Sequence, residues 1–158
     1  MSTVKNNSVN TLLQNNTTEN QFLTFSIDDE EFGIPIEHVN GIIQMCPITI
    51  IPHTEKYIKG VFSLRGDIIP VMDVRERFGK VAKEIDYLNC IIDVIYKEYR
   101  IGLIVDSVSE VMFIHSHQLS APPNNKHDYK NDFIKNIGKT EGKLKLIIDL
   151  EKFLLDRE

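Results

Sequence analysis

The sequence predicts a mainly β protein: two small five-stranded β-barrels of the SH3-like or OB-like kind that share a hydrophobic core, with only short helices. Three observations lead to this fold class. About ten short apolar stretches, many alternating with period two, follow one another at close spacing. No stretch has the periodicity of the long helices that connect parallel strands. A five-stranded barrel takes roughly 60 to 70 residues, so two fit between Gln21 and Asp149. No internal sequence repeat is apparent.

The composition is that of a soluble globular protein, with 42% hydrophobic and 26% charged residues. With 23 acidic against 18 basic residues the net charge is −5, and no Lys/Arg cluster offsets it. Nucleic acid and anionic membrane surfaces are therefore disfavoured as main partners. No apolar run is long enough to insert into a membrane, and the N-terminus lacks the pattern of a secretory signal, which predicts a cytoplasmic protein. Cys46 and Cys90 lie in apolar runs without CxxC spacing, which favours buried thiols.

The first part of the chain predicts a tail followed by a hairpin. Residues 1–20 are polar and rich in Asn and Thr, which indicates a flexible tail. Residues 21–155 form the folded unit of two intertwined barrels, and 156–158 are the C-terminal end. Residues 21–27 alternate as a strand and 31–35 return as its partner across an acidic turn.

The middle of the chain predicts a second, well-defined hairpin. A helical turn near residue 37, a strand at 42–46 and an extended connection at 47–52 lead into it. Its strands are 60–64 and 68–72, joined by a tight turn at Arg65-Gly66-Asp67. Asp73 caps a short helix that Gly79 ends. The long cationic side chain of Arg65, at the tip of this hairpin, does not contribute to core packing.

The last part predicts two more hairpins and a closing helix. The expected segments are a charged exposed stretch at 80–86, a hairpin of 87–95 and 99–105, a strand at 106–114, a long loop at 115–131, a hairpin of 133–140 and 143–148, and a helix at 150–155 capped by Asp149.

No catalytic motif is present, since the phosphate-binding loops and the GxSxG nucleophile motif are all missing. We therefore expect no catalytic residues and no cofactor. The best metal candidates are His115 and His117, with His127 in the same loop, because histidines at i and i+2 project to one side of an extended segment. No further ligands complete the set, which favours solvated histidines. A small metal-dependent enzyme remains the alternative.

The remaining candidates for a function are exposed apolar side chains and the cation of Arg65. Two interpretations fit the apolar side chains of Val39, Val108 and Val111: packing in the core or contact with a partner. Core packing is the simpler interpretation for each. Arg65 is explained equally by a salt bridge to Asp67 or Glu76 or by a contact with a partner.

Three motifs resemble the CheW family, the coupling proteins of bacterial chemotaxis. The most specific is IKGVFSLRGDIIPVMDVRERFG at 58–79; IGLIVDSVSEV at 101–111 and FLTFSIDDEEFGIPIEHV at 22–39 also match. The resemblance covers residues 21–155. It implies two barrels around a shared core, no catalytic activity, and an adaptor between the cytoplasmic tip of a chemoreceptor and the histidine kinase CheA. It also implies a cytoplasmic location at membrane receptor arrays and a monomer outside them.

The resemblance also implies two sets of site residues. The positions expected to bind the regulatory domain of the kinase are Leu23, Ile36 and Val39. The positions expected in, or bordering, the groove for the receptor's helical hairpin are Gly60, Arg65, Val105 and Val108.

Two positions depart from the family pattern. Ser63 stands where the family usually has asparagine, which leaves a weaker brace for the turn. Gly41 stands where the family commonly has glutamate, so we do not expect the partner contact of that glutamate in this chain. A CheV-type protein with a receiver domain is not expected, because only eight residues follow Leu150. An adaptor for a kinase pathway other than motility remains open.

Overall fold

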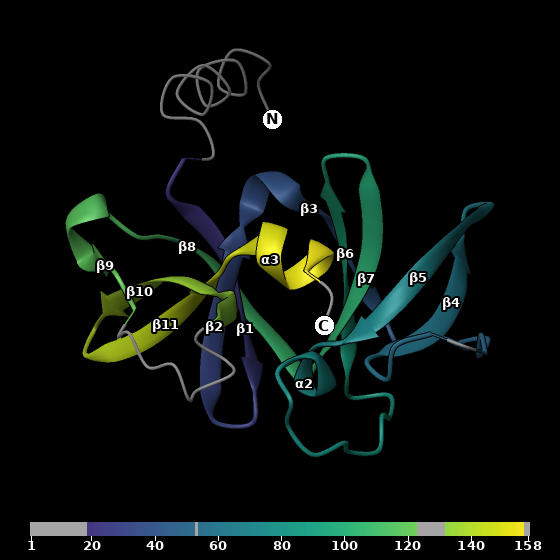
Figure 1. Cartoon of the computed structure of the whole chain (residues 1–158). Coiled ribbons are helices and arrows are strands. Elements are labelled where there is room, and N and C mark those ends of the chain that lie inside the picture. Colours follow the sequence, from purple (N-terminus) through teal and green to yellow (C-terminus); the bar gives the residue numbers. More distant parts are fainter. Residues whose placement is uncertain (1–18, 53, 123–131, 157–158) are drawn as a thin grey trace, which may run out of the picture.

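The computed structural model describes residues 19–52, 54–122 and 132–156, and it confirms the mainly β class (Figure 1). A six-stranded sheet has the order β8-β1-β2-β11-β10-β9, and a five-stranded sheet has the order β3-β6-β7-β5-β4. The strands are β1 (Gln21–Ile27), β2 (Glu30–Pro35), β3 (Val39–Gln44), β4 (Ile58–Leu64), β5 (Asp67–Asp73), β6 (Cys90–Tyr96), β7 (Tyr99–Val105), β8 (Ser107–Phe113), β9 (Leu119–Ser120), β10 (Ile134–Thr140) and β11 (Lys143–Ile148). The helices are η1 (Ile36–His38), α2 (Val74–Arg77), η2 (Ser116–Gln118) and α3 (Leu150–Leu155).

The predicted loop at 115–131 is wrong in its described part. This part contains η2 and the two-residue strand β9, which adds a sixth strand to one sheet. Gln118 holds η2 because its side-chain oxygen accepts the His115 N–H at 2.8 Å. β9 forms because Ser120 pairs with Ile137 of β10. A strand of two residues has no periodicity that a sequence pattern could reveal.

The predicted strand at 87–95 begins later, at Cys90. The preceding residues form a turn in which the Asp86 N–H donates to the side chain of Asn89 at 3.0 Å, and the Leu88 N–H donates to the Asp86 carboxylate at 2.8 Å. Asx side chains that bond nearby backbone in this way favour a turn over a strand.

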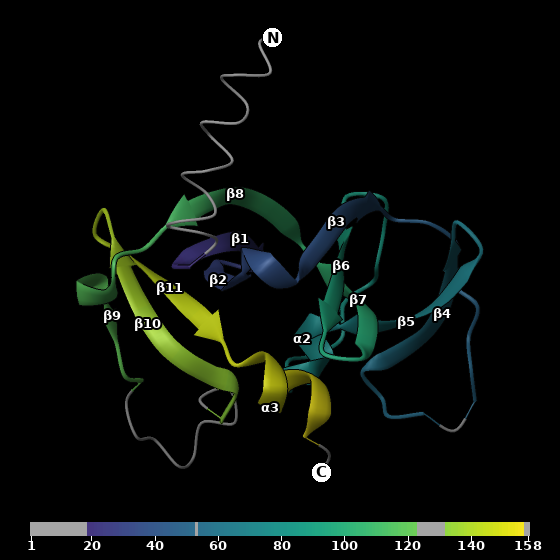
Figure 2. The ribbon, with the colours of Figure 1, turned by 90° about the horizontal axis from the view of Figure 1, so that it is seen from above.

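One core joins the two sheets, as predicted. Its largest cluster contains Phe25 and Phe32 from the six-stranded sheet and Ile92 and Leu103 from the five-stranded sheet, all fully buried. Phe78, which follows α2, stacks on Phe32 with ring centroids 4.9 Å apart. Helices α2 and α3 are neighbours (Figure 2), because the Phe153 ring of α3 lies 5.1 Å from the Phe78 ring that follows α2, and both rings are buried in this core.

The order of elements is repeated within the chain. Each half runs hairpin, single strand, hairpin and short helix: β1–β2, β3, β4–β5 and α2, then β6–β7, β8, β10–β11 and α3. In each half the single strand pairs with the first hairpin of the other half, β3 with β6 and β8 with β1. Both sheets therefore contain strands from both halves.

The strand registers show that the repeat extends to single residues. Gly33 of β2 faces Ile147 of β11 in a parallel pair, and Gly102 of β7 faces Val71 of β5 in the same way. Hairpins β4–β5 and β10–β11 both have a bulge near the start of their first strand. We call residues at the same place in the two halves counterparts. The counterpart pairs include Asp28 and Lys97, Ile36 and Val105, Glu37 and Asp106, Val39 and Val108, Ile42 and Val111, Arg65 and Glu141, and Arg75 and Glu151.

The two short helices have the same N-cap, as the sequence predicts. Asp73 ends β5, and its carboxylate accepts the Arg75 N–H at 3.0 Å. Asp149 follows β11, and its carboxylate accepts the Lys152 N–H at 3.3 Å. Each aspartate thus satisfies a free N–H of the first helical turn. Among the described residues, no helix is long and apolar enough to cross a membrane.

Candidate partner-binding surfaces

Arg65 lies at the exposed tip of the β4–β5 hairpin, as predicted. Its φ is +51°, a left-handed conformation that a non-glycine residue adopts at some cost, and Gly66 follows with φ +88°. Figure 1 shows this hairpin projecting on the side opposite to β9, β10 and β11. The turn therefore presents the guanidinium to solvent, away from the core.

The salt bridge that could have explained Arg65 does not form. Asp67 pairs with Arg100 at 2.9 Å, and Glu76 pairs with Lys59. Within the described part of the chain, Arg65 has no ion pair. Its charge is therefore available to a partner.

Gly60 sits on the same hairpin, but it is buried. Its φ is +145°, and an added Cβ would overlap the carbonyl oxygen of Thr49 and lie 2.9 Å from the Ile48 side chain. The backbones of Thr49 and Val61 exchange hydrogen bonds of 2.8 and 2.9 Å at this point. Gly60 thus fixes the base of the hairpin and does not offer a contact surface of its own.

The three kinase-binding candidates differ in exposure. Leu23 in β1 is 2% exposed and belongs to the shared core. Ile36 and Val39 are half-buried and pack against that core from the start and end of η1. Ile36 and Val39 can therefore contact a partner, whereas Leu23 supports them from beneath.

Val105 and Val108 show the same arrangement in the other half. Val105 ends β7 and is 1% exposed, while Val108 in β8 is half-buried against the shared core. They are the counterparts of Ile36 and Val39. One predicted kinase-binding segment and one predicted receptor-binding segment are thus the same feature occurring twice. Val108 and Arg65 come from different sheets, since β8 lies in the six-stranded sheet and the β4–β5 hairpin in the five-stranded one.

Two exposed apolar side chains extend these segments. Ile42 in β3 and its counterpart Val111 in β8 are each 50% exposed. The reading of Val111 as core is therefore wrong, because β8 is an edge strand and this side chain lies outside the sheet contact. Ile42 shares a strand face with the polar Asn40 and Gln44, and this period-two pattern could have indicated an outward Ile42. Exposed apolar groups on edge strands are typical of partner surfaces.

A charged junction connects the two halves below these surfaces. The Arg75 guanidinium donates to both carboxylate oxygens of Asp28 at 2.9 Å and to Asp106 at 2.8 Å. The Asp28 N–H also donates to Asp106 at 2.7 Å. The hydrogen bond from Arg75 holds the pKa of the Asp28 carboxyl below its ordinary value. Because Arg75 is 9% exposed, this junction locks the β1–β2 turn onto the start of β8.

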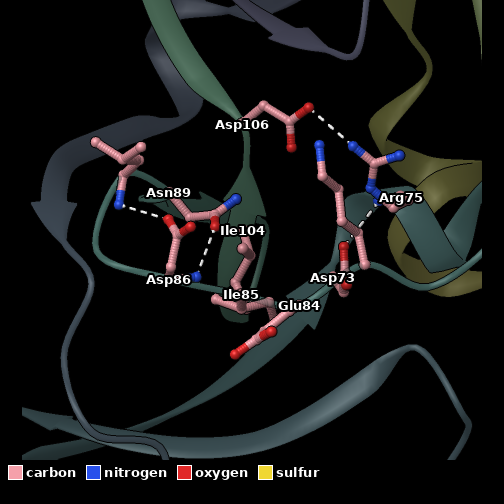
Figure 3. A pocket seen from close by; sticks show the side chains of 10 residues that line it. Asp73, Arg75, Glu84, Ile85, Asp86, Asn89, Ile104 and Asp106 are labelled. Carbon is pink, nitrogen blue, oxygen red and sulfur yellow. Dashed lines mark hydrogen bonds and ion pairs between the residues drawn. The ribbon is translucent and has the colours of Figure 1, made fainter.

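A polar pocket of about 180 Å³ lies beside this junction (Figure 3). Arg75 reaches across it toward Asp106, and Asp86 and Asn89 form the opposite wall. Burial raises the pKa of the Asp73 carboxyl there. The lining combines carboxylates with Arg75 and Lys83. Four lining carboxylates, those of Asp73, Glu84, Asp86 and Asp106, face these two cations, so the lining is net negative.

The described residues do not support a metal centre. They contain no group of three or more His, Cys, Asp or Glu residues that could hold an ion. The rings of His115 and His117 stack on each other with centroids 5.3 Å apart, and both side chains are exposed. His127 lies outside the described residues. Cys46 and Cys90 are half-buried free thiols.

Comparison with known proteins places this geometry in context. A family model described as a CheW-like domain matches residues 21–158. The chemotaxis protein CheW of Klebsiella aerogenes is 30% identical over 146 residues, covering 92% of this chain and 88% of the relative. CheW of Bacillus subtilis is 31% identical over 141 residues, covering 89% and 90%. The crystal structure of the scaffolding protein TtCheW from Thermoanaerobacter tengcongensis matches with a TM-score of 0.80 at 33% identity, covering 87% of this chain and 94% of that one.

Proposed function

The chain belongs to the CheW family of chemotaxis scaffold proteins, which are not enzymes, and from this premise we propose that it couples chemoreceptors to the histidine kinase CheA. The receptor partner is the cytoplasmic hairpin tip, and the kinase partner is the regulatory domain. The adaptor works in the cytoplasm at membrane receptor arrays and is a monomer outside them. Phosphoryl transfer then takes place entirely in the kinase.

The observation that carries the receptor contact is the free charge of Arg65. It is exposed at a rigid hairpin tip, and the neighbouring carboxylates of Asp67 and Glu76 are paired with other cations. A receptor carboxylate can therefore pair with it without breaking an internal bond. Val108 would take apolar groups of the receptor helices, with Val105 and Gly60 as buried supports.

The kinase contact is proposed for η1 and β3 in the first half of the chain. Ile36 and Val39 offer apolar surface beside the 50% exposed Ile42, and the buried Leu23 supports them. The equivalent segments around Val39 and Val108 come from opposite halves, and such separate contacts let one molecule hold two partners at once. This is the arrangement that an adaptor needs.

Calorimetric titration against a receptor cytoplasmic fragment and against the kinase regulatory domain tests the proposal. We expect Arg65→Glu to weaken receptor binding about tenfold, roughly 1.4 kcal/mol, and to leave kinase binding unchanged. Val39→Lys should weaken kinase binding and leave receptor binding unchanged.

The variants need a folding control, because Val39 packs against the core. Ile42→Glu changes the same surface at an exposed position and should also weaken kinase binding without a change in Tm. If the folded wild type binds neither partner, or if Arg65→Glu affects both titrations equally, the two-surface adaptor is rejected.

A further inference from the structure

A pocket of about 320 Å³ lies between the two halves, on the side of η1 and α3. Its walls come from the start of β1, η1, the β6–β7 turn, β10, β11 and the start of α3. We call it the η1–α3 pocket. Its volume is at the lower end of the range for ligand sites, enough for one or two side chains of a peptide.

The pocket combines an apolar floor, an aromatic wall and an acidic rim. Phe22 and Leu150 are buried in its floor. The rings of His38 and Tyr96 meet edge to face, with centroids 5.0 Å apart. Its cationic lining is Lys135, together with His38 when protonated. Its carboxylates are those of Glu19, Glu37, Asp149 and Glu151. The lining is therefore net negative.

The surroundings of α2, the counterpart of α3, show which group the lining of the η1–α3 pocket lacks. There Arg75, the second residue after the cap Asp73, bridges the carboxylates of Asp28 and Asp106. One internal guanidinium thus pairs with two carboxylates, one in the β1–β2 turn and one directly before β8. At this place the arginine that binds the carboxylates comes from the chain itself.

In the second half the charges at these positions are changed. Glu151 is the counterpart of Arg75, and it pairs with Lys97, the counterpart of Asp28. Glu37, the counterpart of Asp106, therefore has no arginine. Among the described residues its only ion-pair partner is His38, at 3.6 Å. Its side chain is 59% exposed at the rim of the pocket.

We propose that the η1–α3 pocket binds the arginine side chain of an extended peptide segment of a partner protein. The guanidinium pairs with Glu37, as Arg75 does with Asp106. The apolar floor takes the aliphatic stem. The site is separate from Arg65, and its test requires neither the receptor nor the kinase.

The test is an NMR titration of the full-length protein with two tripeptides, acetyl-Leu-Arg-Leu-amide and its citrulline analogue, which has the same shape without the charge. We expect the arginine peptide to shift the amide signals of His38 and Tyr96 and to bind at least fivefold more tightly than the citrulline peptide. Glu37→Gln should remove this preference.

Glu141→Gln is the matched control, because it deletes the same charge at an exposed hairpin tip outside the pocket. It should bind the arginine peptide like the wild type. Equal binding of both peptides, unchanged binding by a folded Glu37→Gln, or signal shifts confined to other surfaces would each overturn the proposal. Because neither the receptor nor the kinase is present, such a failure leaves the adaptor function untouched.

Discussion

Arg75 shows how one residue can tie distant parts of the chain together. Its guanidinium holds Asp28 from the β1–β2 turn and Asp106 from the start of β8, although the side chain itself comes from α2. Hydrogen bonds between charged groups are stronger than neutral ones when they are shielded from water. Asp28 is half-exposed, so the junction orients the turn more than it adds stability.

The pH dependence of folding should report this junction. Arg75 lowers the pKa of Asp28 below its ordinary value of 3.8 in the folded protein. A lowered carboxyl pKa contributes stability that is present above 3.8 and is lost as the pH falls through the folded-state pKa. We therefore expect Arg75→Gln to be less stable than the wild type at neutral pH, and the difference to shrink on acidification below 3.8. Urea unfolding at a series of pH values measures it.

Arg65→Gln is the control for this prediction, because it removes the same charge from a side chain that has no ion pair in the described structure. Its stability should follow the wild type at every pH. A stability gap for Arg75→Gln that stays constant through the acid range would show that Arg75 acts through packing and not through the Asp28 charge.

At the scale of elements, the β4–β5 hairpin depends on one glycine at its base. Gly60 allows the Thr49 backbone to approach β4 closely and to exchange two hydrogen bonds with Val61. Any side chain at this position would push that segment away. The hairpin that carries Arg65 would then lose its fixed direction.

Gly60→Ala should therefore lower the free energy of unfolding by more than about 2 kcal/mol, through the overlap with Thr49 and the positive φ. Gly66→Ala is the matched control. It also has positive φ, but no atom lies within 4 Å of its added Cβ. It should cost only about 1 kcal/mol. Chemical denaturation of both variants measures the difference, and equal losses would show that the contact with Thr49 is unimportant.

The hairpins were predictable from sequence because local signals agree there. Alternating strands, a glycine in the turn and a capping aspartate all specify β4, β5 and α2. Strand β9 was not predictable, because two residues carry no pattern. The repeat was hidden because its halves share few identical residues, such as Gly66 and Gly142 in the turns or Asp73 and Asp149 at the caps.

The site residues show the same limit. The exposure of Arg65 could be predicted, since a hairpin tip faces solvent. The burial of Leu23 and Val105 could not, because apolar residues of a strand suit either a core or a partner surface until the neighbouring strands are known. Likewise, only the pairing of β8 at a sheet edge exposes Val111.

At the scale of the whole molecule, the two halves are not independent units. Strand β3 of the first half completes the sheet of β6 and β7, and β8 of the second half completes the sheet of β1 and β2. The largest apolar cluster contains residues of both sheets. Neither half can bury its apolar surface without the other, so we expect a single cooperative unfolding transition.

Dividing the chain in the loop between α2 and β6 tests this interdependence. The loop is mostly exposed, so a cut between Lys83 and Glu84 removes no strand pairing. We expect fragments 1–83 and 84–158 to be unfolded when alone, because each lacks strands of both sheets, and to assemble into the native fold when mixed. Amide signal dispersion in NMR spectra measures folding. Full-length protein cleaved at an inserted protease site in the same loop is the control and should stay folded. A native-like spectrum from either fragment alone would contradict the interdependence of the halves.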